Sequence, residues 1–109
     1  MTSEELLAVL TAVGHGQRLR VIAGLAGLSG GRMYVSELAR RLGISRPLLS
    51  MHLDRLEKAD LVAGHLDLSE DGKALKYFEL EPFDLHLNIG TISTAVAADA
   101  EGHSDMKAT

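Results

Sequence analysis

Apolar and polar positions between residues 36 and 61 repeat with the period of two short helices. In the first helix, Leu38 and Leu42 lie four residues apart. In the second, the leucines are spaced by four and three residues: Leu49, Leu53 and Leu56. Because residues with this spacing share one face of a helix, each predicted helix has an apolar inner face. The opposite face of the second helix is therefore predicted to be exposed.

The residues at the predicted helix ends are typical of helix boundaries. Ser36 and Ser45 stand just before the two helical runs, where a hydroxyl can accept a hydrogen bond from a backbone N–H. Gly43 suits the left-handed conformation that ends a helix, and Pro47 suits the first turn of the next helix. Together they predict a helix-turn-helix, which presents its second helix to a DNA major groove. A capped helix pair of an ordinary small α-helical domain is the alternative interpretation.

A β-hairpin is predicted directly after this helix pair. Residues 61–68 and 74–80 form two apolar runs, and the segment between them contains Gly72, which tolerates a positive φ. A hairpin in this position is a wing, so it favours the helix-turn-helix over the ordinary helix pair. Residues 33–35 are predicted to add a short third strand beside it. The fold class is therefore mainly α with a small β-hairpin wing.

Two more helices are predicted near the N-terminus of a single domain that spans residues 1–100. The first covers residues 2–13, where Thr2 and Glu5 have the spacing of a capping box. The second covers residues 17–28 and is expected to direct four side chains inwards: Leu19, Ile22, Leu25 and Ala26. A loop is expected at 29–31.

The C-terminal part of the chain is predicted to form one helix and a tail. Pro82 ends the second strand of the wing, and an apolar repeat then predicts a helix from residue 84 to residue 100. The segment 101–109 is small and polar, and it is expected to be disordered.

Composition narrows the class of protein. The 109 residues are 46% hydrophobic, which suffices for one small core that would gain from burial in a dimer. The chain has no cysteine, so disulfides and thiolate metal sites are excluded. It has neither a signal-peptide pattern nor an apolar run of about 20 residues, so a cytoplasmic protein without a membrane partner is expected.

Charge is unevenly distributed along the chain. Residues 15–58 carry eight Arg or Lys and three Asp or Glu side chains, a net charge of +5, although the whole chain has a net charge of −4. A cationic segment of this kind favours docking on phosphates, although a charged run is also typical of a solvated face.

Two motifs resemble the ArsR/SmtB family of winged-helix transcriptional regulators: G-H-x-x-R-L-R at residues 14–20 and I-S-R-P-L-L-S-M-H-L at residues 44–53. The resemblance extends from about residue 6 to residue 100. It implies a homodimer, joined by the first and last helices, that binds operator DNA through two recognition helices and responds to an effector. Apolar stripes on these terminal helices agree with that interface: Leu6, Leu10, Val13, Leu85, Ile89, Ile92 and Val96.

DNA contacts are expected from the two helices and the wing: Arg40, Arg41, Ser45, Arg46, Leu48, Ser50, Met51, Arg55, Lys73 and Lys76. Arg46 is suited to a guanine or a phosphate, and Leu48 to a thymine methyl group. The family pattern is not followed everywhere, because Met51 and Asp54 replace polar or basic residues and the wing tip carries Glu70 and Asp71. His52 is expected to be a packed, hydrogen-bonded histidine, and His15 and His65 are interpreted as structural.

The same resemblance raises the question of a metal effector. Asp84 and His86 are similar to one half of the interfacial site of the zinc- and nickel-responsive members. The positions that supply the other half are Ala97 and Ala100, which have no donor atoms. Glu101 and His103, with Asp99, are the nearby groups that would have to complete a rearranged nickel or zinc site; no other cofactor is expected.

Enzymatic function is not predicted, because the chain has no nucleophile motif, phosphate-binding loop or closed set of metal ligands. Two functions from different classes stay open. The first is a DNA-binding regulator, either sensing its effector directly or relying on a separate corepressor protein. The second is a winged-helix protein interaction module that does not read DNA, which the acidic wing and Asp54 favour.

Overall fold

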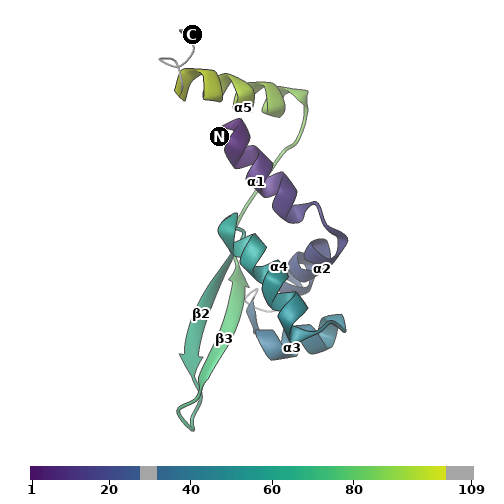
Figure 1. The fold of residues 1–109 in the computed structure, drawn as a ribbon, viewed down its shortest axis with the longest axis vertical. Coiled ribbons are helices and arrows are strands. Elements are labelled where there is room, and N and C mark those ends of the chain that lie inside the picture. The colour runs from purple at the N-terminus through teal and green to yellow at the C-terminus, as the bar shows by residue number, and fades with distance from the viewer. Residues whose placement is uncertain (28–31, 103–109) are drawn as a thin grey trace.

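Five helices and a three-stranded antiparallel sheet form the described part of the chain, residues 1–27 and 32–102, in this computed structural model. In chain order they are α1 (Ser3–Val13), α2 (Gly16–Ala26), β1 (Arg32–Tyr34), α3 (Val35–Leu42), α4 (Arg46–Lys58), β2 (Val62–Leu68), β3 (Ala74–Leu80) and α5 (Ile89–Gly102). Figure 1 shows the β2–β3 hairpin projecting beside α4 and α3. This arrangement confirms the predicted winged helix-turn-helix.

The sheet has the strand order β1-β3-β2, and both pairings are antiparallel. Gly72 has φ 82° in the turn between β2 and β3, as its predicted role requires. The third strand covers residues 32–34 rather than 33–35, because Val35 already belongs to α3. Three register rows cross the whole sheet, and in one of them Tyr77 on β3 faces Tyr34 on β1 and His65 on β2.

The core lies where α2, α3 and α4 meet the sheet. Leu49, Leu53 and Leu56 of α4 have no exposed surface, which confirms the predicted inner face of that helix. From the other elements, the core takes mainly aliphatic side chains: Ala12, Val21, Leu25, Met33, Val35, Leu38, Ala39, Leu61, Val62 and Phe78. Burying large aliphatic side chains contributes about 1.5–3 kcal/mol each, so this cluster is the main source of stability.

The inward face of α2 differs from the prediction. Leu25 is buried and Ile22 packs against the core, but Leu19 and Ala26 are exposed. The buried residues are Arg18, Val21 and Leu25, spaced by three and four, so the helix is rotated relative to the predicted stripe. A polar residue, Arg18, occupies an inward position that an apolar pattern could not reveal.

The ends of α3 and α4 follow the predicted capping, with one correction. Gly43 has φ 69°, and the Ser45 hydroxyl accepts a hydrogen bond of 3.2 Å from the Leu48 N–H. Ser36 does not cap α3, because β1 runs directly into the helix and Tyr34 occupies the cap position without a side-chain hydrogen bond. Ser36 therefore lies inside the first turn of α3.

The predicted capping box at the start of α1 is confirmed. The Thr2 hydroxyl accepts from the Glu5 N–H at 3.2 Å, and the Thr2 N–H donates to Glu5 Oε1 at 3.1 Å. The helix itself begins at Ser3, whose N–H donates to Asp99 Oδ1 at 2.8 Å. This last bond joins the start of α1 to α5, and the carboxylate lies where the helix dipole favours negative charge.

The last helix begins later than predicted. Residues 81–88 form a non-helical strap, and α5 runs from residue 89 to residue 102 rather than from 84 to 100. Asn88 supplies the start, because its Oδ1 accepts from the Thr91 N–H at 2.8 Å. Leu28, the loop 29–31 and the tail 103–109 lie outside the described residues, so the predicted disorder of the tail stays a prediction.

The chain is elongated. Its radius of gyration is 17.3 Å and its extents are 60 × 26 × 24 Å, whereas about 13 Å is expected for a compact domain of this length. Figure 1 shows α5 packed across α1 at one end of the long axis and the wing tip at the opposite end. Within residues 1–27 and 32–102, no helix is long and apolar enough to cross a membrane.

Candidate nucleic-acid interface

The outward face of α4 lies opposite its buried residues, which include His52 as well as the three leucines. Four residues follow one another along the middle of this face: Pro47, Met51, Asp54 and Lys58. Met51 is 44% exposed, and Lys58 Nζ lies 3.2 Å from Asp54 Oδ2. The two opposite charges on the C-terminal half of this face thus neutralise each other, while the N-terminal half is open to a ligand.

The predicted contact residues of α4 lie on different flanks of the helix. Ser50 borders a cleft of about 250 Å³ that also takes Lys76 from the wing. Arg55 lines a different cleft of about 340 Å³, formed with Glu4 and other residues of α1. Leu48 is half-buried, so only part of its side chain reaches solvent. Arg46, Ser50 and Met51 are therefore exposed on the outward and wing sides of α4, whereas Arg55 lies beside α1.

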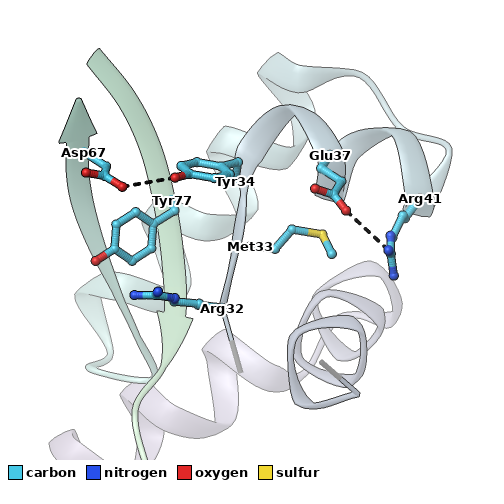
Figure 2. A pocket seen from close by; sticks show the side chains of 7 residues that line it. All are labelled: Arg32, Met33, Tyr34, Glu37, Arg41, Asp67 and Tyr77. Carbon is cyan, nitrogen blue, oxygen red and sulfur yellow. Dashed lines mark hydrogen bonds and ion pairs between the residues drawn. The ribbon is translucent and has the colours of Figure 1, made fainter. Parts of the chain in front are cut away.

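The two arginines of α3 also differ in orientation. Arg40 is exposed, whereas Arg41 Nη2 lies 3.3 Å from Glu37 Oε1. Figure 2 shows this ion pair on one side of a pocket of about 360 Å³, opposite the tyrosines of the sheet. Arg41 thus faces the outer surface of the sheet, away from the outward face of α4.

An aromatic row on the outer face of the sheet forms the other side of this pocket (Figure 2). The Tyr77 ring meets the Tyr34 ring edge-on at 5.9 Å and stacks on His65 at 5.1 Å. The Tyr34 hydroxyl donates to Asp67 Oδ2 at 3.1 Å, and this bond raises the pKa of Tyr34. Arg32 lies 5.2 Å from the centre of the Tyr77 ring. These cross-strand contacts fasten the wing to β1 and through it to α3.

The wing carries fewer available cations than its sequence indicates. Lys73 Nζ lies 4.0 Å from Asp71 Oδ2, and the Asp71 side chain also accepts from the Ser69 hydroxyl and the Lys73 N–H. These hydrogen bonds lower the pKa of Asp71, which holds a negative charge at the tip. Lys76 Nζ lies 5.1 Å from the Phe78 ring centre, close to the α4 side of the wing. Of the two predicted wing contacts, Lys76 is therefore the better placed.

His52 belongs to a buried polar network that ties α4 to α1 and α2. Arg18 Nη1 donates to His52 Nδ1 at 3.2 Å, and His52 Nε2 donates to Gln17 Oε1 at 2.8 Å. Because a guanidinium only donates, Nδ1 must accept and the proton of neutral His52 lies on Nε2. Burial lowers the pKa of His52, assisted by the nearby His15 and Arg18. The predicted packed, hydrogen-bonded histidine is confirmed.

The same network reaches the end of α1 and the start of α2. Arg18 Nε donates to the Ala12 carbonyl at 2.5 Å, and Nη2 donates to the Thr11 carbonyl at 3.3 Å. His15 caps α2, because its Nδ1 accepts from the Gln17 N–H at 3.1 Å. His65 lies 2.9 Å from Glu79 Oε1 on the sheet. Both histidines thus make structural contacts.

The terminal helices bring the predicted dimer residues to different places. Leu6 is buried within the chain, and Leu10 and Val13 are half-buried. Leu85 is half-buried in the strap rather than on a helix. Of the predicted interface residues, those on α5 are exposed to solvent: Ile89, Ile92 and Val96. Leu7, one position from Leu6, is also exposed, so the exposed apolar face of α1 is not the predicted one.

The predicted metal residues lie on the strap. His86 Nε2 is 3.0 Å from Asp84 Oδ1, and both side chains are strongly exposed. Among residues 1–27 and 32–100, no three His, Asp or Glu side chains gather as a metal site would require. The Glu101 side chain and His103 lie outside the described residues. Two donors do not fit the four-ligand shell typical of structural zinc, so Asp84 and His86 alone do not form a metal centre.

Comparison with known proteins adds to this geometry. A family model described as a helix-turn-helix domain matches residues 13–65, the segment that contains α2, α3, α4 and the start of the wing. By its fold the chain is a winged helix-turn-helix protein. The helix-turn-helix predicted from the sequence is thereby confirmed. No curated protein sequence matches the chain.

Solved structures share the fold of this chain at low sequence identity. A possible transcriptional regulatory protein from Mycobacterium bovis has a TM-score of 0.62 at 17% identity, over 93% of this chain and 92% of that one. A regulator of the ArsR family has a TM-score of 0.59 at 20% identity, over 96% and 98% of the two chains. Reduced HlyU from Vibrio cholerae also has a TM-score of 0.59 at 20% identity, over 91% and 88%.

Proposed function

We propose that this protein is a sequence-specific DNA-binding transcriptional regulator that acts as a homodimer on operator DNA. The observation that carries this proposal is the outward face of α4, which is open while the opposite face is fully buried. Arg46 lies at the N-terminal end of this face, where helix-turn-helix proteins contact base edges. Most of the chain's cations lie between residues 15 and 58, which supports docking on phosphates. The proposed activity is binding rather than catalysis.

The shape and the exposed apolar residues of the chain support the homodimer. Ile89 is 84% exposed, and Ile92 and Val96 are also open on α5. α5 packs mainly on α1, at a distance from the core that lies between α2, α3, α4 and the sheet. A second copy of the same surface would cover these residues. Two recognition helices would then address half-sites about 34 Å apart on one face of the duplex.

Direct binding to DNA tests the proposal. Operator sequences would be selected from fragmented genomic DNA, and affinity measured by fluorescence anisotropy at several salt concentrations. We expect the affinity to fall steeply as salt rises, because bound cations release counterions. Arg46→Ala should cost about 1–3 kcal/mol of specific binding if the guanidinium forks onto a guanine.

Arg32→Ala is the matched control for that variant. Arg32 is also an exposed arginine, but it lies on the outer face of the sheet against Tyr77 and not on α4 (Figure 2). It should leave DNA affinity nearly unchanged. If no duplex binds even at low salt, the protein is instead an interaction module that recruits a partner protein, which the acidic wing tip would suit.

Sensing is assigned to a partner or to another ligand, because no complete metal site lies among the described residues. Asp84 and His86 bring two donors together, but Ala97 and Ala100 have none to add. Calorimetric titration of Ni²⁺ and Zn²⁺ should give binding too weak to compete with a four-ligand site. Tight binding that is lost in the Asp84→Ala/His86→Ala variant would overturn this assignment and make the protein a direct nickel or zinc sensor. A separate corepressor protein is the partner that weak binding would favour.

A further inference from the structure

The outward face of α4 is apolar at its centre. Pro47 and Met51 lie one helical turn apart in the middle of the outward face, and neither side chain offers a strong hydrogen bond. Arg46 and Ser50 stand toward the wing flank of this pair, so hydrogen-bonding groups border the centre rather than occupy it. One turn further along, Asp54 is already paired with Lys58.

Met51 lies outside the buried core of the domain. Nearly half of it is exposed, and it is absent from the core cluster that holds α4 on the domain. Its thioether is flexible and polarisable, so it can adapt to an apolar partner of irregular shape.

The major groove displays one apolar group, the C5 methyl of thymine. The other groups at the base edges are hydrogen-bond donors and acceptors, which would lose water against Met51 without gaining a partner. A thymine methyl at the same place would bury apolar surface on both sides. The chemistry of the centre of this face therefore selects one base.

We propose that Met51 is a specificity-determining residue that packs on a thymine methyl group near the centre of each half-site. This inference rests on the proposed DNA-binding function and gives the operator a chemical requirement. Base preference at that position arises from apolar contact, while Arg46 supplies hydrogen bonding at the adjacent end of the helix. The operator class is thus one with a thymine within reach of the middle of α4 in both halves.

Replacing thymine by deoxyuridine tests this directly, because uracil keeps base pairing and every hydrogen-bonding atom and lacks only the methyl group. In a selected operator, each thymine would be replaced singly and then symmetrically in both halves. We expect one position per half-site at which the wild-type affinity falls about fourfold, and about fifteenfold when both halves are changed. The other positions should be nearly neutral.

Met51→Ala identifies the residue that reads the methyl group. This variant should bind the thymine operator more weakly and lose its sensitivity to uracil at the same position, while Met51→Leu should keep it. Leu66→Ala is the matched control, since Leu66 is an exposed apolar residue on the wing and not on α4. That control should remain as sensitive to uracil as the wild type.

The outcomes separate this inference from the function on which it rests. Specific DNA binding that no uracil replacement weakens would overturn the role of Met51 and leave the proposed function intact. Sensitivity to uracil that persists in Met51→Ala would also overturn it, because another residue would then read the methyl group. Failure to bind any duplex would overturn both.

Discussion

The outward faces of α4 and α5 both meet solvent, but their chemistry differs. The face of α4 carries Arg46, Ser50 and the Asp54–Lys58 ion pair around a small apolar centre. The face of α5 presents Ile89, Ile92 and Val96 and no charged residue among them. A charged, hydrated face suits a ligand that is itself charged and hydrated. An aliphatic face gains the most binding free energy when it is buried against another aliphatic surface.

The two faces are also supported differently. Behind α4 lies the fully buried core, with a hydrogen-bonded network around His52. Among the described residues α5 packs mainly on α1, where Ala95 is buried and Asp99 accepts hydrogen bonds from Ser3. We propose that the helix-turn-helix and the wing are complete within one chain, while a second copy covers the α5 face.

Charging the α5 face should separate the subunits. Ile92→Asp/Val96→Asp places two carboxylates where we expect an apolar interface, so sedimentation should give a monomer where the wild type is a dimer. Operator affinity should fall by about 10²- to 10⁴-fold, because the two half-sites would be bound independently.

Leu66→Asp/Leu68→Asp is the control for general surface effects. Both leucines are 73% exposed on the wing, and their substitution should leave the sedimentation of the dimer unchanged. A wild type that sediments as a monomer at micromolar concentration would contradict the proposed assembly.

Removing the guanidinium of Arg18 should uncouple α1 from α4. Arg18→Met leaves the Thr11 and Ala12 carbonyls and His52 Nδ1 without their buried donor. We expect a loss of about 3 kcal/mol in the free energy of unfolding, measured by urea denaturation. Arg20→Met is the control: its exposed bond to the Leu42 carbonyl should be worth less than about 1 kcal/mol. Equal losses of unfolding free energy in Arg18→Met and Arg20→Met would show that the buried network stabilises the fold no more than the exposed bond does.

Reversing the charge at the wing tip should sharpen the role of α4. Glu70→Lys/Asp71→Lys removes repulsion of phosphates and releases Lys73 from its ion pair. Affinity should rise for specific and nonspecific duplexes alike, and the salt dependence should steepen by about one unit for each new phosphate contact. A change confined to one operator sequence would mean that the wing reads bases.

Acid should weaken the network that supports α4. Because burial lowers the pKa of His52 in the folded chain, the unfolded chain takes up the proton first as pH falls. The contribution of His52 is fully present above about pH 6.5 and is lost below it, as the pH approaches the lowered pKa. The groups facing its ring are His15 and Arg18, with Arg55 also nearby. Urea denaturation between pH 5 and 8 should therefore show a smaller decline in His52→Gln than in the wild type.

Local signals in the sequence were sufficient to predict the helix-turn-helix and the wing. The leucine spacing of α4, the left-handed Gly43, the Ser45 cap and the turn at Gly72 each act within a few residues, so their consequences can be worked out from neighbours alone. The same holds for the capping box of α1. These signals also agree with one another, which is why the winged helix-turn-helix could be predicted as a whole.

The site was less predictable than the fold. The exposed residues of α4 could be predicted from helical geometry, but the separation of Arg55 toward α1 and of Arg41 toward the sheet depends on elements far away in the sequence. The engagement of Lys73 by Asp71 likewise depends on the conformation of the turn. The buried pair of Arg18 and His52 gave only a weak signal, two polar residues on otherwise apolar helix faces.

The sequence by itself therefore determined the helix-turn-helix, the wing and the location of the cationic segment, since periodicity, caps and turns are local properties of the chain. Only the tertiary structure decided that Leu6 is covered while Leu7 is open, that Asn88 rather than Asp84 begins the last helix, and that Arg18 is an inward residue. The physical reason is that a helix pattern identifies which residues share a face, whereas the partner that covers that face comes from segments distant in sequence.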